Sequence, residues 1–250
     1  MEEDKSYEVG KSNFDLPHDV VVLPSGGIFY KSKKKSIKVG YLTASDENLL
    51  LGASKNFTLQ LLRNKIYEHD LRPEEMLEGD IEAILIFLRN TSFGTEMELL
   101  VNDPKTNTKF KTIVDLSELS ILKGELPDSD GLFTTELPKT GDVVKIKPLT
   151  YGEILEINDI IDNYPPTRTA PRVTLRLTKE IQSINDNTDK TYIAKYVDSM
   201  PIADSKHIKK FLNENEPKLD LKRNIMTPSG DMTTVYAGFG VEFFRPFFGI

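Results

Sequence analysis

Two stretches near the start of the chain show hydrophobic and polar patterns that predict β-strands. Val20–Leu23 is rich in β-branched residues, and Ser36–Leu42 alternates polar and apolar side chains with a period of two. The Pro-Ser-Gly-Gly sequence at 24–27 is typical of a turn. The same connection carries a lysine cluster at 31–35. We interpret this cluster as a hairpin tip with its charges in water, an anionic contact being the alternative.

Three helices are predicted next, because apolar residues recur at helical spacing. The first covers Thr43–Gly52, where Thr43 or Ser45 can cap the positive end. The second covers roughly Phe57–His69, and the third follows the Arg-Pro pair at 72–73 and ends near residue 91. The clearest apolar stripe lies in the third helix and consists of Ile81, Ile84, Leu85 and Leu88. We expect this stripe to be part of the core.

The pattern then returns to strands, in two predicted hairpins. Thr95–Val101 and Thr108–Val114 enclose the turn sequence Asn-Asp-Pro-Lys-Thr-Asn. Phe133–Leu137 and Val143–Lys147 enclose Pro-Lys-Thr-Gly-Asp. Both pairs alternate in hydrophobicity and are joined by residues that favour turns, so each is expected to be antiparallel.

A helical region and a final hairpin complete the prediction. The helices are expected at Tyr151–Asn163, Ala170–Ile184, Asp189–Met200 and Ala203–Asn215. The adjacent prolines 165 and 166 cannot lie inside a helix and separate the first two. Leu219–Met226 and Met232–Tyr236 flank Thr-Pro-Ser-Gly-Asp, another strong hairpin signal.

These elements predict an α+β protein in four parts. Residues 1–18 are polar and patternless, and we interpret them as a flexible tail. A β-rich domain at 19–149 carries the three-helix insert at about 44–92. A helical domain at 150–216 follows, and 217–250 forms a C-terminal hairpin with an aromatic docking tail.

The chain ends in an unusual aromatic segment, because the last twelve residues hold five of its thirteen phenylalanines. A buried Phe contributes roughly 1.5–3 kcal/mol, whereas chain ends are usually polar. The segment is therefore expected to fold back over the last hairpin, to dock into another protein, or both. The residues predicted to bind a partner are Tyr236, Phe239, Phe243, Phe244, Arg245, Phe247 and Phe248. Arg245 would add a charge-assisted hydrogen bond.

Composition narrows the classes of partner. The net charge of −7 and the pI near 5.2 argue against nucleic acid, because phosphates would repel the chain. No stretch approaches the ~18 apolar residues of a membrane span, and the acidic N-terminus argues against a secretory signal. The absence of cysteine removes disulfides and thiolate sites. We therefore expect protein partners, and no nucleic acid, membrane or small-molecule substrate.

The sequence specifies no active site. His18, His69 and His207 are not spaced as metal ligands, and no nucleotide-binding glycine motif or nucleophile elbow is present. The acidic stretch 128–142 lacks the closing glutamate of a calcium loop, since Glu136 falls at the ninth place. We predict no metal, no cofactor and no enzyme. A hydrolase with unpatterned carboxylates remains as an alternative, which buried unpaired acids in a cleft would favour.

Several short motifs, taken in order, resemble one family. They are Leu23-Pro-Ser-Gly-Gly-Ile-Phe-Tyr30, Leu42-Thr-Ala-Ser-Asp-Glu47, Leu77-Glu-Gly-Asp80, Leu149-Thr-Tyr-Gly152, Met200-Pro-Ile-Ala-Asp-Ser205, Glu214-Asn-Glu-Pro217 and Phe243-Phe-Arg-Pro246. Together they resemble baseplate proteins of T-even-like contractile-tailed bacteriophages. The similarity spans nearly the whole chain from residue 20.

The chain departs from that family in one respect. Relatives often carry Cys-Pro-x-Cys pairs in two hairpins, which would form a zinc ribbon. Here the matching places hold Asp103, Thr106, Thr227 and Gly230, which offer no thiolates. Metal binding is therefore not carried over, and the hairpins are expected to be held by neighbours or by docking.

The resemblance implies a structural or assembly role at the baseplate hub of a bacteriophage, through contacts with other hub or tail proteins. It implies the host cytoplasm during assembly and the virion baseplate afterwards. The alternative is a transient assembly chaperone for hub or tape-measure proteins that does not stay in the virion.

Overall fold

The computed structural model describes residues 17–51, 57–238 and 243. These residues form helices and several small antiparallel sheets, so the predicted α+β class is confirmed. The predicted tail lies outside the described residues except for Pro17 and His18. His18 belongs to the first strand. None of the described helices is long and apolar enough to cross a bilayer.

The first unit opens with the predicted hairpin, β1 (His18–Val22) paired with β2 (Ser36–Gly40). Lys31, Lys33 and Lys35 are exposed in the connection between the strands, as expected for a hairpin tip. Two predicted helices follow as α1 (Ala44–Leu51) and α2 (Phe57–Lys65). Thr43 stands just before α1, where its backbone N–H and its hydroxyl both donate to Asp46, each at 2.7 Å.

The third predicted helix is divided into a 3-10 helix, η1 (Pro73–Glu75), and the long helix α3 (Glu78–Phe93). The backbone between them is extended, because the Met76 carbonyl accepts from Tyr151 N–H at 2.7 Å and Leu77 forms a bridge with Thr150. Tertiary pairing thus breaks a helix that local pattern would have continued. The predicted stripe on α3 is confirmed as core, since Ile81, Ile84, Leu85 and Leu88 are all buried.

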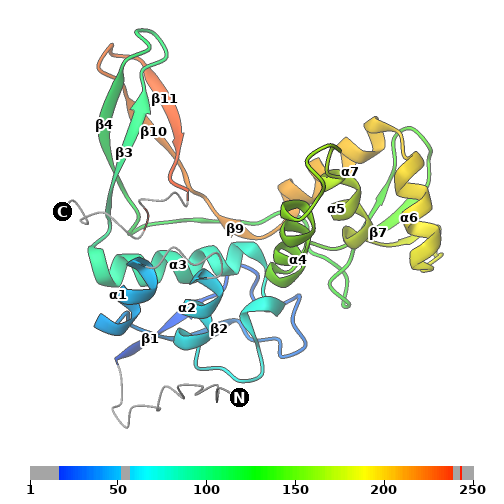
Figure 1. The fold of residues 1–250 in the computed structure, drawn as a ribbon, viewed down its shortest axis with the longest axis horizontal. Coiled ribbons are helices and arrows are strands. Elements are labelled where there is room, and N and C mark those ends of the chain that lie inside the picture. The colour runs from blue at the N-terminus through cyan, green and yellow to red at the C-terminus, as the bar shows by residue number, and fades with distance from the viewer. Residues whose placement is uncertain (1–16, 52–56, 239–242, 244–250) are drawn as a thin grey trace, which may run out of the picture.

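Two hairpins rise side by side from this unit (Figure 1). They are β3 (Glu96–Asn102) with β4 (Lys109–Asp115), and β10 (Lys222–Met226) with β11 (Met232–Tyr236). Both were predicted. Their inner faces supply Met97, Val114, Ile225 and Val235 to the same hydrophobic core as α3.

The second unit has its own hydrophobic cluster around the three-stranded sheet β6 (Phe133–Glu136), β7 (Val143–Ile146) and β8 (Ile181–Ile184). Its helices are α4 (Tyr151–Asp162), α5 (Arg172–Glu180), α6 (Lys190–Ser199) and α7 (Ile202–Asn215). The predicted boundary at residue 149 runs through this unit, because β6 and β7 belong to its sheet.

The helix predicted at Ala170–Ile184 is wrong in its last turn. The chain leaves α5 at Glu180, and β8 pairs with β7. Ile181, Ser183 and Ile184 are all buried. A spacing of three between isoleucines suits a helix and also a strand that is buried on both faces, so the pattern alone could not separate the two.

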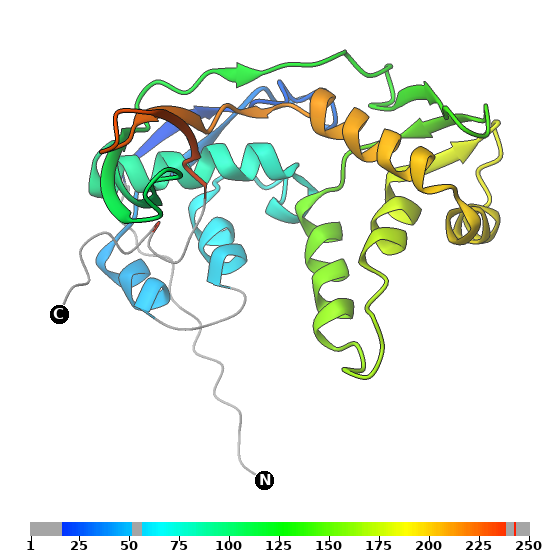
Figure 2. The ribbon, with the colours of Figure 1, turned by 90° about the horizontal axis from the view of Figure 1, so that it is seen from above.

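Two extended segments connect the units. The short strands β5 (Ile121–Leu122) and β9 (Lys218–Leu219) pair antiparallel, so the chain passes from one unit to the other and back along one path (Figures 1 and 2). Neither strand was predicted as a pair, because two residues carry no period.

Candidate functional site

Two of the motif segments meet around a buried carboxylate. Asp80 at the start of α3 is fully buried and accepts from Ser25 N–H at 2.8 Å, from Ser25 Oγ at 2.5 Å and from the Tyr30 hydroxyl. The same Tyr30 oxygen accepts from Leu77 N–H at 2.9 Å. Burial raises the pKa of both Asp80 and Tyr30 above their usual ranges. These hydrogen bonds hold the β1–β2 connection against α3, so we assign these residues a structural role.

Two other motifs provide close contacts between the units. A Cβ on Gly79 of α3 would lie 2.3 Å from the backbone oxygen of Pro217, just after α7. A Cβ on Gly152 of α4 would lie 2.9 Å from the backbone oxygen of Glu74 in η1. Only glycine permits these approaches, so the motifs place α3 and η1 of the first unit against the second.

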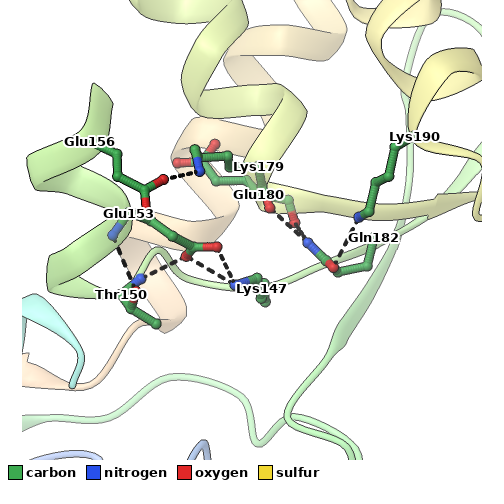
Figure 3. Close-up of polar contacts among 8 residues, drawn as sticks. All are labelled: Lys147, Thr150, Glu153, Glu156, Lys179, Glu180, Gln182 and Lys190. Carbon is green, nitrogen blue, oxygen red and sulfur yellow. Dashed lines mark hydrogen bonds and ion pairs between the residues drawn. The ribbon is translucent and has the colours of Figure 1, made fainter. Parts of the chain in front are cut away.

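Polar contacts hold the start of α4 in place (Figure 3). Thr150 caps the helix, and Glu153 closes the capping box by accepting from Thr150 N–H at 2.9 Å. Lys147 Nζ donates to the same carboxylate at 2.8 Å. On the outer side, Lys179 Nζ reaches Glu156 at 2.7 Å. The α4 and α5 helices are thereby tied to each other and to the end of β7.

A cleft of about 450 Å³ opens where the units meet. Its walls come from α3, α4, α5, α7, β9, β11 and the β7–α4 connection. The charged residues that line it are Glu78, Glu82, Glu180, Glu216, Arg176, Lys209 and Lys218. Leu149, Ile154, Leu212 and Tyr236 are among the remaining lining residues.

The carboxylates of this cleft are perturbed. Burial, with a smaller contribution from Glu78, raises the pKa of Glu82 and that of Glu216 to about 7 each. Burial likewise raises the pKa of Glu180, against the lowering effect of Arg176. The Glu180 side chain is 5 % exposed, and its Oε2 has no hydrogen-bond partner. The pKa of Tyr236 rises to about 12 through burial and the nearby Glu82.

The sequence did not reveal this cluster, because its acids come from three separate segments, with Glu78 and Glu82 in one and Glu180 and Glu216 in the others, and only the fold gathers them. The one available signal was that two of the motifs, Leu77–Asp80 and Glu214–Pro217, each contain a glutamate. The condition that would favour a hydrolase, buried unpaired acids in a cleft, is met only in part, because Glu180 is buried but forms an ion pair with Arg176, and Glu82 and Glu216 are half-buried. Among the described residues, however, no group of three or more His, Asp or Glu side chains could hold a metal ion.

The tips of the β3–β4 and β10–β11 hairpins meet at Asp103 and Ser229. Asp103 is fully buried and accepts from Ser229 N–H at 3.1 Å and from Ser229 Oγ at 3.0 Å on the other hairpin. It also accepts from the Lys105 N–H at 2.9 Å. Desolvation alone would raise the pKa of Asp103, but these hydrogen bonds hold it below its usual value. Neighbouring groups therefore join the tips, as the sequence led us to expect.

The structure separates the residues that were predicted to bind a partner. Tyr236 is 59 % exposed on β11. Phe243 is 1 % exposed and packs into the core of its own chain, with the Arg89 guanidinium 5.9 Å from its ring centroid. The docking role predicted for Phe243 is thus corrected to an internal one, the fold-back alternative. The others lie outside the described residues: Phe239, Phe244, Arg245, Phe247 and Phe248.

An exposed apolar face accompanies Tyr236. The register pairs Met226 with Met232 and Lys222 with Tyr236, which puts all four side chains on the outer face of the β10–β11 hairpin. Met226 and Met232 are 69 % and 63 % exposed. The outer face of β3–β4 likewise exposes Leu100 and Ile113. The hairpin pair thus has apolar side chains on both outer faces.

Comparison with known proteins agrees with the resemblance noted from the motifs. A family model described as T4 bacteriophage base plate protein matches residues 28–245. No curated protein and no solved structure matches the chain. The match covers far more than half of the sequence and includes both units, the cleft and both hairpins. The chain therefore belongs to the T4 bacteriophage base plate protein family.

Proposed function

We propose that this baseplate protein is a component of the baseplate hub and acts through contacts with other hub or tail proteins. Membership of the family supports a structural role in the virion baseplate and contacts with other tail or baseplate proteins. The position at the hub and the surface used are the proposed parts. Assembly would begin in the host cytoplasm.

The observation that carries the proposal is the outer face of the β10–β11 hairpin. Met226, Met232 and Tyr236 are each more than half exposed there, on a hairpin that projects from the body of the molecule (Figure 1). A large apolar side chain contributes roughly 1.5–3 kcal/mol when it is fully buried. Three such side chains on one projecting face favour a contact with another polypeptide.

The aromatic end of the chain extends this surface in the proposal. We assign Tyr236, Phe239, Phe244, Arg245, Phe247 and Phe248 to the partner contact. Phe243 serves as the internal anchor, because its ring is buried beside Arg89. The anchor lies seven residues after Tyr236 along the chain.

Substitution of the outer face tests the proposal. The double variant Met226→Ser, Met232→Ser leaves Tyr236 and the cleft unchanged, and it should lose co-purification with hub proteins of the same phage while its melting temperature changes little. The matched control is Leu100→Ser, Ile113→Ser on the outer face of the other hairpin. The proposal fails if the Met226, Met232 variant still co-purifies with hub proteins, or if only the control loses them.

Deletion of residues 244–250 tests the aromatic end while keeping the Phe243 anchor. We expect the shortened chain to fold as before and to bind hub proteins more weakly. Unfolding of the shortened chain would show that the deleted rings belong to its own core.

The alternative is a transient assembly chaperone, which would share the exposed apolar surface. Mass spectrometry of purified particles separates the two, because a chaperone is absent from the virion and a hub component is present. A hydrolase is favoured only by the buried acids of the cleft. The family suggests a protein without catalytic activity, and we propose a binding role for those acids.

A further inference from the structure

We propose that the acidic cleft between the two units binds an arginine side chain of another polypeptide. The cleft is formed by both units together, since α3 and β11 come from the first and α4, α5 and α7 from the second. The proposal depends on the proposed function only for the source of the arginine. The cleft itself can be tested without any partner protein.

The charges lining the cleft leave an excess of negative charge. Four glutamates (78, 82, 180 and 216) face three cations (Arg176, Lys209 and Lys218), which leaves a formal charge of −1. An excess of one charge on a solvated surface would mean little. Here the acids are in part withdrawn from water, so an uncompensated carboxylate is costly.

Glu180 shows where a ligand cation would go. Its side chain is only 5 % exposed, and its Arg176 partner approaches Oε1 at 3.4 Å, beyond the usual distance of a charge-assisted hydrogen bond. Oε2 has no hydrogen-bond partner. Lys209 on α7 attracts the Glu180 carboxylate, whereas Glu153 on α4 repels it. A donor from a ligand would satisfy this buried oxygen.

The lining favours arginine over a metal ion. Metal ligands must converge on one point, and the described residues contain no group of three acidic or histidine side chains that does so. The carboxylates instead stand on separate elements around the cleft: Glu82 on α3, Glu180 on α5 and Glu216 after α7. A guanidinium has five donors in one plane and can reach several acceptors at once. Leu149, Ile154 and Leu212 offer apolar surface to its aliphatic stem.

Occupation of the cleft would have a structural consequence. A side chain that contacts α3 and α5 together bridges the first and second units. A neighbouring baseplate protein that supplies the arginine would therefore also fix the orientation of the two units.

The test is a titration of the full-length protein with N-acetyl-arginine methylamide at pH 8, followed by amide chemical shifts. We expect saturable shifts at residues that line the cleft, and none with the neutral isostere N-acetyl-citrulline methylamide. Glu180→Gln should weaken binding of the arginine probe about tenfold or more, because the substitution removes a charged acceptor. Glu216→Gln is a second variant should the first fail to fold.

The matched control is Glu156→Gln on α4, whose carboxylate is 66 % exposed, faces Lys179 and lies outside the cleft lining. It should bind the probe as the natural chain does. Equal binding of the citrulline probe, unchanged binding by both cleft variants, or tighter binding of Ca²⁺ than of arginine at these residues would overturn the proposal. Co-purification with hub proteins is measured separately, so failure of this inference is distinguishable from failure of the proposed function.

Discussion

Tyr30→Phe is the sharpest test of how the motif residues hold the first unit together. The substitution removes one hydroxyl and leaves the ring, which is 4 % exposed, in place. That hydroxyl donates to Asp80, which is fully buried, and accepts from Leu77 N–H at 2.9 Å. The change therefore removes a donor from a buried carboxylate and the acceptor of a buried backbone N–H.

The expected loss follows from these two bonds. A hydrogen bond to a charged group contributes about 1.5–3 kcal/mol, and a buried group left unsatisfied costs about 1–3 kcal/mol. Because both effects share one oxygen they do not simply add, and we expect about 2–4 kcal/mol less free energy of unfolding. Urea denaturation followed by circular dichroism measures this loss.

Tyr41→Phe is the matched control. The Tyr41 hydroxyl donates to Asp19 at 2.5 Å, but this pair lies at the exposed surface, where water replaces a lost bond. Its loss should be much smaller than that of Tyr30→Phe. If the two variants lose the same free energy of unfolding, the buried hydrogen bonds of Ser25, Tyr30 and Asp80 are not what stabilises the β1–β2 connection.

Three further predictions concern the hairpin tips, the cleft and the chain end. Asp103→Ala should speed hydrogen exchange at the Ser229 amide by about tenfold or more, because the cross-hairpin acceptor is lost; unchanged exchange would contradict this. The folded-state pKa values of Glu82 and Glu216, about 7, exceed their ordinary value of 4.5. Their contribution to the free energy of unfolding is therefore full below pH 4.5 and is lost as the pH rises through 7. Together the two groups should lower the free energy of unfolding by up to about 5 kcal/mol from pH 5 to pH 8, and this fall should become smaller when both are changed to Gln, while Glu180 still titrates. Phe243→Ala should lower the free energy of unfolding, measured by urea denaturation, by about 3–5 kcal/mol, whereas substitution of an exposed docking residue would lower it little.

Local sequence predicted the elements whose signals are local. The hairpins β3–β4 and β10–β11 each combine alternating strands with a turn rich in Pro, Asn, Asp or Gly, and both form as expected. The stripe on α3 likewise identified its buried face. In each of these cases the residues that decide the structure lie close together in the sequence, within one hairpin or one helix.

Distant contacts decided the elements that were predicted wrongly or missed. The helix expected from 73 onward is divided because Met76 pairs with Tyr151 of the other unit. The sequence predicts helix through β8 because isoleucines at 181 and 184 have helical spacing, and only the pairing with β7 makes this segment a strand.

The candidate sites show the same limit. The aromatic end was visible as composition, yet the burial of Phe243 beside Arg89 depends on two residues more than 150 positions apart. The acidic cleft collects glutamates from α3, α5 and the end of α7, so no spacing in the sequence marks it. The motifs that carry the family resemblance turn out to include residues of the Asp80 cluster and of the contact between the units.

Cross-linking mass spectrometry of purified virions tests the central claim most directly. Lys222 is exposed on the outer face of β10, beside Tyr236, whereas Lys111 lies on the outer face of the other hairpin. The proposed function predicts cross-links from Lys222 to another hub or tail protein, and fewer from Lys111. Absence of the chain from virions, or cross-links from Lys222 to its own chain alone, would contradict it.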